Sequence, residues 1–149
     1  CSIKLNNCFL LPNTQAIMNN GITWNKKDKV FITDPFNQRV KEFNLVFDPK
    51  AELNKRVTLT LEKDFYVDFF MDNILYEEKR NLLHVGLIGK GKDNLEVMNY
   101  VSSNKKLPEI ATDLNDEKQI RNHAGAGVID LNSGKFEVLL FHSKTFSSS

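Results

Sequence analysis

The sequence of 149 residues has little cysteine, almost no net charge and no long apolar run. Its two cysteines, Cys1 and Cys8, lie only seven positions apart. That spacing supports neither a disulfide framework nor a zinc site, and it leaves the redox state of both thiols open. The formal net charge of +1 gives no argument for a nucleic-acid partner. No apolar run reaches the roughly 18 residues of a membrane-spanning helix, so we expect no transmembrane segment in this chain.

The chain begins at Cys1 without an initiator Met, and its first residues lack the basic and apolar segments of a signal peptide. We therefore expect it to be a fragment of a longer protein. Its length is sufficient for one domain with a hydrophobic core. No strong amphipathic helix is visible, and eleven Phe against one Trp indicate that phenylalanine supplies most of the aromatic core.

The stretch Phe65-Tyr-Val-Asp-Phe-Phe-Met-Asp-Asn-Ile-Leu-Tyr76 alternates with a period of two and contains neither Pro nor Gly, which predicts a β-strand. Asp72 and Asn73 interrupt its apolar run. Since neighbours on a strand point to opposite faces, one of the two should meet a partly buried face. An unpaired carboxylate is costly there, and a bound cation would remove that cost. A carboxylate beside an amide oxygen suits Ca²⁺. The alternative is a strand end, with Asn73 starting a turn and Asp72 in solvent.

Short apolar segments and turn signals recur along the chain and predict an all-β fold. A set of strands follows the turn signal at Asn20-Gly21, a second set starts near Asn73, 53 residues later, and a third begins at Gly125. A four-stranded unit that recurs about every 40 to 55 residues is the signature of propeller blades. We assign approximate blades to residues 1–62, 63–107 and 108–149. The predicted strands are 7–11, 22–24, 29–33, 38–47, 56–61, 65–76, 82–86, 95–101, 125–130 and 135–141, with a loop or short helix near 116–121.

Several segments, in the same order over nearly the whole chain, resemble the second half of a paraoxonase/arylesterase. The Asn-Gly-Ile turn is shared by many propellers, whereas the Asp-Asn pair at this distance from it is more specific. The resemblance implies a six-bladed β-propeller with calcium ions in its central channel and hydrolysis of lactones and aryl esters. The segments that carry it are Asn20-Gly-Ile-Thr23, Lys29-Val-Phe-Ile-Thr-Asp34, Met71-Asp-Asn-Ile74, His84-Val-Gly86 and Gly134-Lys-Phe-Glu-Val-Leu-Leu-Phe-His142.

The resemblance also implies a ligand set. Asn20 matches a calcium-ligand asparagine of the family, and Asp72 and Asn73 match the adjacent pair that binds the catalytic calcium. In the implied mechanism, the ion polarises the ester carbonyl and stabilises the developing oxyanion. Two positions depart from the family: Leu87-Ile88 stands where it has a histidine, and Ser147 replaces the cysteine of its closing disulfide. The three histidines are expected to be non-catalytic, with His84 and His142 on strands and His123 in an exposed loop.

The length limits what this chain does alone. Six blades need roughly 250 residues or more, and about three blades cannot close a ring. The open ends would expose unpaired strand edges, so we expect another chain or a missing N-terminal half to complete the propeller. Two functions stay open: a calcium-dependent arylesterase or lactonase once completed, or a non-catalytic module with a structural or interaction role in a larger assembly. The resemblance suggests a secretory, extracellular or membrane-associated location.

Overall fold

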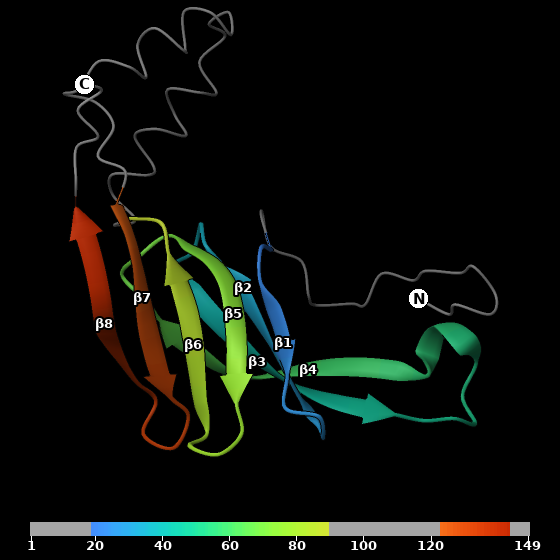
Figure 1. Ribbon diagram of the computed structural model, residues 1–149. Helices are drawn as coiled ribbons and strands as arrows, with labels where there is room; N and C mark the ends of the chain where they lie inside the picture. Colours follow the sequence, from blue (N-terminus) through green and yellow to red (C-terminus); the bar gives the residue numbers. More distant parts are fainter. Residues whose placement is uncertain (1–18, 90–122, 144–149) are drawn as a thin grey trace, which may run out of the picture.

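The computed structural model describes residues 19–89 and 123–143, which form two four-stranded antiparallel sheets (Figure 1). Within these ranges the only helical segment is one 3₁₀ turn, so the predicted all-β class is confirmed there. None of the described residues forms a helix long and apolar enough to cross a membrane. The elements are β1 (Ile22–Trp24), β2 (Lys29–Asp34), β3 (Arg39–Phe47), η1 (Leu53–Lys55) and β4 (Val57–Tyr66) in the first sheet, and β5 (Met71–Glu77), β6 (Leu82–Leu87), β7 (His123–Asp130) and β8 (Lys135–Ser143) in the second.

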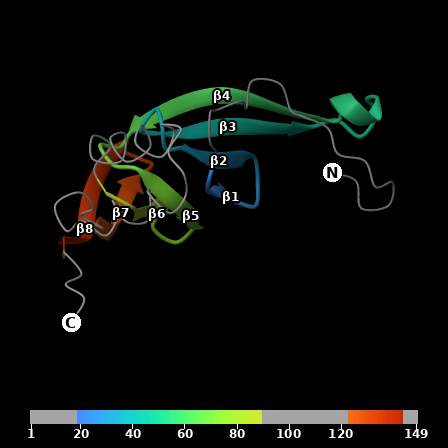
Figure 2. The same cartoon turned by 90° about the horizontal axis from the view of Figure 1, so that it is seen from above.

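Strands that follow one another in the chain are also neighbours in each sheet, because short polar turns join most of them. The β1–β2 turn is closed by Asn25, whose side-chain Oδ1 accepts hydrogen bonds from the main-chain N–H groups of Lys27, Asp28 and Lys29. Lys26 in this turn and Asn81 in the β5–β6 turn adopt positive φ angles of 64° and 55°. Strands β3 and β4 extend well beyond the rest of the first sheet and carry η1 at their tip (Figure 2).

One hydrophobic core joins the two sheets. Phe31 and Val40 of the first sheet and Leu83, Val85 and Ile129 of the second are at most 1% exposed in this core. The opposite face of the first sheet carries a smaller cluster of buried side chains, so both faces of β2 are buried. Burial on both faces explains why the middle of β2, Val30-Phe-Ile32, is an uninterrupted apolar run rather than an alternating one. The smaller cluster consists of Val30, Ile32, Phe43 and Leu59.

The prediction of a single strand over residues 65–76 was wrong. Strand β4 ends at Tyr66 and β5 begins at Met71, and the residues between them cross from one sheet to the other. Val67 and Phe69 in this crossover are only 0% and 8% exposed, and the Val67 N–H donates to the Gln38 carbonyl at 2.9 Å. The stretch is apolar because the crossover is buried in the core between the sheets, which a period-two pattern does not distinguish from a strand.

The structure also differs from the prediction that a third unit opens at Gly125. Strand β7 pairs with β6, with Val85 opposite Gly127, so residues 71–87 and 123–143 share one sheet. Gly125 and Gly127 belong to the predicted strand 125–130. They lie inside β7 because aromatic rings pack over them: an added Cβ at Gly127 would meet the Phe136 ring at 2.4 Å. The predicted elements at 7–11, 95–101 and 116–121, together with Cys1, Cys8 and Ser147, lie outside the described residues.

Candidate metal site

Strands β1 and β5 are in contact and begin at the same end of the two sheets, called here the entry end and marked by Gly21 and Met71 (Figure 1). Gly21 is buried, and a Cβ added to it would lie 2.7 Å from the carbonyl oxygen of Asp72 and 2.9 Å from the main-chain nitrogen of Ile74. The main chains of the two strands therefore touch directly. Asn20 precedes this contact in the chain, so all three predicted ligands lie at the entry end.

The hydroxyl of Thr33 forms a hydrogen-bonded bridge between the starts of β1 and β5, next to this contact. Thr33 is fully buried, and its Oγ1 accepts a hydrogen bond from the Gly21 N–H at 2.6 Å. The same oxygen lies 3.3 Å from the Asp72 carbonyl and 3.4 Å from the Gly21 carbonyl, and its single hydrogen can be donated to one of them. This bridge holds the main chain of Asp72 against the start of β1.

A β-bulge presents Asp72 and Asn73 together. Met71 pairs with Leu87 and Ile74 pairs with Val85, so the two residues between them on β5 lie opposite Gly86 alone. Met71 and Ile74 are 0% and 8% exposed, whereas Asp72 is partly exposed and Asn73 is exposed. The extra residue of a bulge interrupts the regular alternation of a strand, so the faces that Asp72 and Asn73 take do not follow from their spacing in the sequence.

Within residues 19–89 and 123–143, the side chains of Asn20, Asp72 and Asn73 form no hydrogen bond or ion pair. They offer one carboxylate and two amide oxygens, which are hard ligands of the kind Ca²⁺ takes. No three His, Cys, Asp or Glu side chains in the described ranges gather as a metal centre, and the predicted set contains a single carboxylate. Three oxygens fill only part of the six to eight positions around Ca²⁺.

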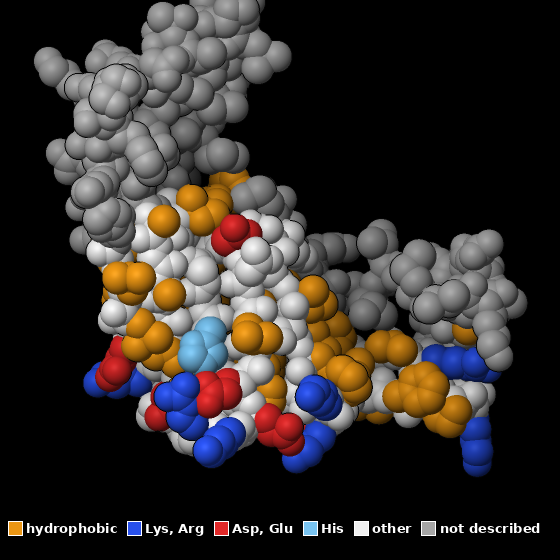
Figure 3. All heavy atoms as spheres, in the orientation of Figure 1, with side chains coloured by type: hydrophobic (Ala, Val, Ile, Leu, Met, Phe, Trp, Pro, Cys, Tyr) orange, Lys and Arg blue, Asp and Glu red, His pale blue; other side chains and the backbone are white. Residues whose placement is uncertain are grey.

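His84 is the only histidine whose side chain the structure describes. It lies half-buried on β6, and its Nε2 is 2.8 Å from Oε2 of Glu77. Arg80 donates two hydrogen bonds to the same carboxylate, at 2.6 and 2.7 Å. The hydrogen bonds from Arg80 and then from His84 lower the pKa of Glu77 to about 2. His84 is thus held in a polar cluster at the rim of the second sheet, where charged side chains gather near the turns (Figure 3).

Sequence reasoning located the three ligand candidates but missed Thr33, the Gly21 contact and the bulge opposite Gly86. Of these three features, only the Gly21 contact had a signal in the sequence, because a glycine permits the close approach of two main chains. Comparison of this chain with family models and with curated proteins found no match, so membership of the paraoxonase/arylesterase family stays a prediction.

Proposed function

We propose that the two sheets are neighbouring blades of a calcium-binding β-propeller, and that the completed ring hydrolyses esters or lactones. The observation that carries the proposal is the contact of Gly21 with Asp72 and Ile74, which brings the starts of β1 and β5 together. Two meanders packed face to face, with their first strands adjacent, are the arrangement expected of successive blades. In such a ring the first strand of each blade lines the central channel, so a cation bound there would be within reach of residues from all blades.

The residues of this chain fit a calcium ion. Asp72 supplies the only formal charge among the three candidates, and no Lys or Arg in the part of the chain that the structure describes forms an ion pair with it. The bulge opposite Gly86 and the Thr33 bridge fix the main chain from which this carboxylate extends. When bound, Ca²⁺ would polarise a substrate carbonyl and stabilise the oxyanion that develops. The further ligands, and a base to activate water, would come from the completing half.

A non-catalytic propeller module is the second candidate. It is favoured by the engagement of His84 with Glu77, which leaves no described histidine committed to the entry end. In this reading calcium would only hold the blades together. The two candidates share the metal site and differ in whether the completed protein turns over an ester.

Calcium binding is tested by titration calorimetry on the full chain and on two charge-matched variants. Asp72→Asn should weaken calcium binding by about tenfold or more, because a charge-bearing ligand is lost. Asp64→Asn removes an exposed carboxylate on β4 and should leave binding unchanged. With only part of the shell present, we expect a dissociation constant of about 10⁻⁴ to 10⁻³ M. Absence of calcium uptake by the chain and by its complex with the completing half would refute the site.

Hydrolysis is tested separately, with an aryl acetate and a small lactone as substrates for the completed protein. Calcium-dependent turnover that Asp72→Asn abolishes would support the hydrolase. Calcium binding without turnover of either substrate would favour the non-catalytic module.

A further inference from the structure

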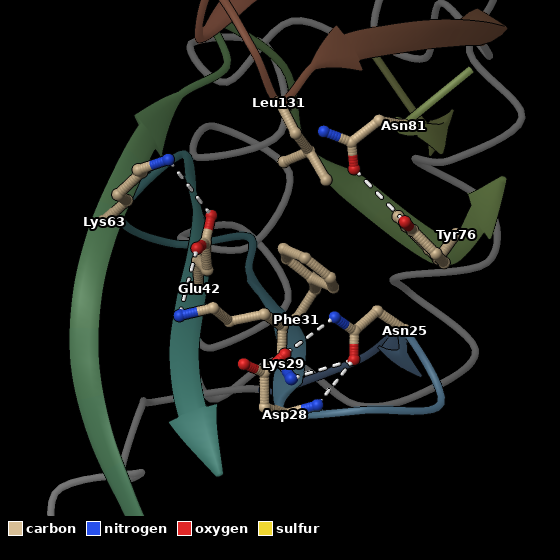
Figure 4. Close-up of a pocket in the computed structure, with 9 residues that line it drawn as sticks. All are labelled: Asn25, Asp28, Lys29, Phe31, Glu42, Lys63, Tyr76, Asn81 and Leu131. Carbon is tan, nitrogen blue, oxygen red and sulfur yellow. Dashed lines mark hydrogen bonds and ion pairs between the residues drawn. The ribbon is translucent and has the colours of Figure 1, made fainter. Parts of the chain in front are cut away.

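A pocket of about 190 Å³ lies between the two sheets at their turn end, the end that carries the β1–β2 turn (residues 25–28) and the β5–β6 turn (residues 78–81). It is far along the strands from the entry end, and none of the three predicted calcium ligands lines it. Figure 4 shows Glu42 between Lys29 and Lys63 on one wall, with Tyr76 and Asn81 on the other. We call it the junction pocket.

Within the described residues, no group donates a hydrogen bond to the carboxylate of Glu42 in this pocket. Glu42 is 5% exposed, and the ammonium groups of Lys29 and Lys63 are each 3.9 Å from one of its oxygens, too far for a hydrogen bond. An ionised carboxylate has about four acceptor positions, and the Glu42 oxygens line the pocket, where they can accept hydrogen bonds from its contents. A molecule that donates hydrogen bonds to Glu42 from within the pocket would replace solvent at these positions.

The charges around the pocket select an uncharged molecule. Two lysines beside Glu42 disfavour a metal ion or an amine, and the carboxylates of Glu42 and Asp28 disfavour an anion. Lys29 is already committed, since its ammonium group also pairs with Glu62 outside the pocket and hydrogen-bonds the side chain of Asn44. The lining lysines and acids therefore balance one another, and hydrogen bonding rather than net charge decides what binds.

The hydrogen-bonding groups match hydroxyls. Lys63 offers only donors and Glu42 offers only acceptors, so a group that both accepts and donates can bridge them. A hydroxyl does both. Across the pocket, the Tyr76 hydroxyl donates to Asn81 Oδ1 at 3.2 Å and keeps acceptor capacity for a second hydroxyl. Tyr76 stacks on Phe31 with 5.9 Å between ring centroids, which adds an apolar wall for the carbon skeleton.

We propose that the junction pocket binds a small, uncharged polyol, with a single sugar ring as its largest ligand. The volume is below the roughly 300–1,000 Å³ of pockets for drug-sized ligands, which limits the size. Glu42 accepts from one or two hydroxyls, Lys63 donates to one of them, and the Tyr76 side contacts the opposite edge of the molecule. The site is independent of calcium and of ester hydrolysis.

The test is titration calorimetry of the full chain with glycerol, myo-inositol, glucose and galactose, beside inorganic phosphate and calcium chloride. We expect at least one polyol to bind with a dissociation constant of about 1 mM, as suits a ligand of this size. Glu42→Gln should weaken that binding about 10- to 100-fold, the usual effect of losing a charged acceptor. Glu52→Gln, which changes an exposed glutamate beside η1, and Asp72→Asn should leave it unchanged.

If Glu42→Gln fails to fold, Lys63→Met provides a second variant that keeps the buried carboxylate. It should also weaken polyol binding. The proposal is overturned if none of the four polyols binds saturably. It is also overturned if Glu52→Gln weakens binding as much as the pocket variants do, or if phosphate or calcium binds in the pocket instead, as judged by sensitivity to Lys63→Met.

Discussion

Replacing Gly21 by Ala should weaken the junction between the two sheets at the entry end. The new Cβ would lie 2.7 Å from the Asp72 carbonyl oxygen and 2.9 Å from the Ile74 nitrogen. Both atoms belong to the main chain, so no flexible side chain can move aside. Strand β5 must shift, and the Thr33 hydroxyl, which hydrogen-bonds the Gly21 N–H at 2.6 Å, must shift with it.

The size of the effect follows from that geometry. Inserting a methyl group into a packed contact costs about 1–3 kcal/mol, and the upper half of that range applies because the obstacle is main chain. For a chain of this length a loss in that upper half corresponds to a fall in Tm of about 4–12 °C. Equilibrium urea unfolding, followed by circular dichroism and by Trp24 fluorescence, gives the free energy of unfolding directly.

Gly86→Ala is the matched control, because it adds the same methyl group on the other side of the Asp72–Asn73 bulge. Its Cβ would lie 3.6 Å from the Asn73 oxygen and 3.7 Å from the Asp72 Cβ, which are ordinary contacts. We expect a change within about 0.5–1 kcal/mol, of either sign. A stable Gly21→Ala variant, or an equal loss in both variants, would refute the claim that the two strands touch at Gly21.

Two further predictions concern buried groups. Burial alone would raise the pKa of the Asp34 carboxyl, but its 2.6 Å ion pair with Lys41 and the hydrogen bond from Asn37 outweigh burial and lower the pKa. The lowered folded-state pKa stabilises the fold above about pH 4, and this stabilisation disappears as the pH falls through the folded-state value. Lys41→Met should therefore cost about 3–5 kcal/mol at pH 7 and progressively less as the pH falls below about 4 and Asp34 becomes protonated; a cost that does not change with pH in urea unfolding would contradict this. Leu83→Ala, at a fully buried position of the shared core, should cost about 2–5 kcal/mol, whereas Leu61→Ala, at a position 47% exposed, should cost less than about 1 kcal/mol; similar losses would mean that the two sheets do not share this core.

The structural features that depend on residues close together in the sequence were predictable. Alternating residues predicted most strands of the first sheet, and Asn25 to Asp28 predicted the β1–β2 turn, because a hairpin turn closes through its own side chains. The crossover after Tyr66 was not predictable, since its apolar residues are buried by packing between sheets. The pairing of β7 with β6 was not predictable either, because the two strands are separated by 35 residues in the sequence.

The candidate site divides in the same way. Asn20, Asp72 and Asn73 were proposed from residue type and from a family resemblance. In the structure Asn20 lies just before β1, and Asp72 and Asn73 lie at the start of the neighbouring strand β5. The bulge was not foreseen, because it depends on which residue of β6 faces the pair. The same holds for Glu42, whose burial follows from its place opposite Phe31 in the sheet rather than from any pattern around it.

The uneven connections between strands have a consequence for the order of folding. Turns of four residues join β5 to β6 and β7 to β8, whereas 35 residues separate Leu87 from His123, the ends of β6 and β7. Closing that longer loop costs about 2 kcal/mol more in chain entropy than closing a four-residue turn. The β6–β7 pairing should therefore form late in folding, after the local hairpins, and against the surface that the first sheet already provides. The second sheet would then assemble from two separate hairpins, with its outer one added last.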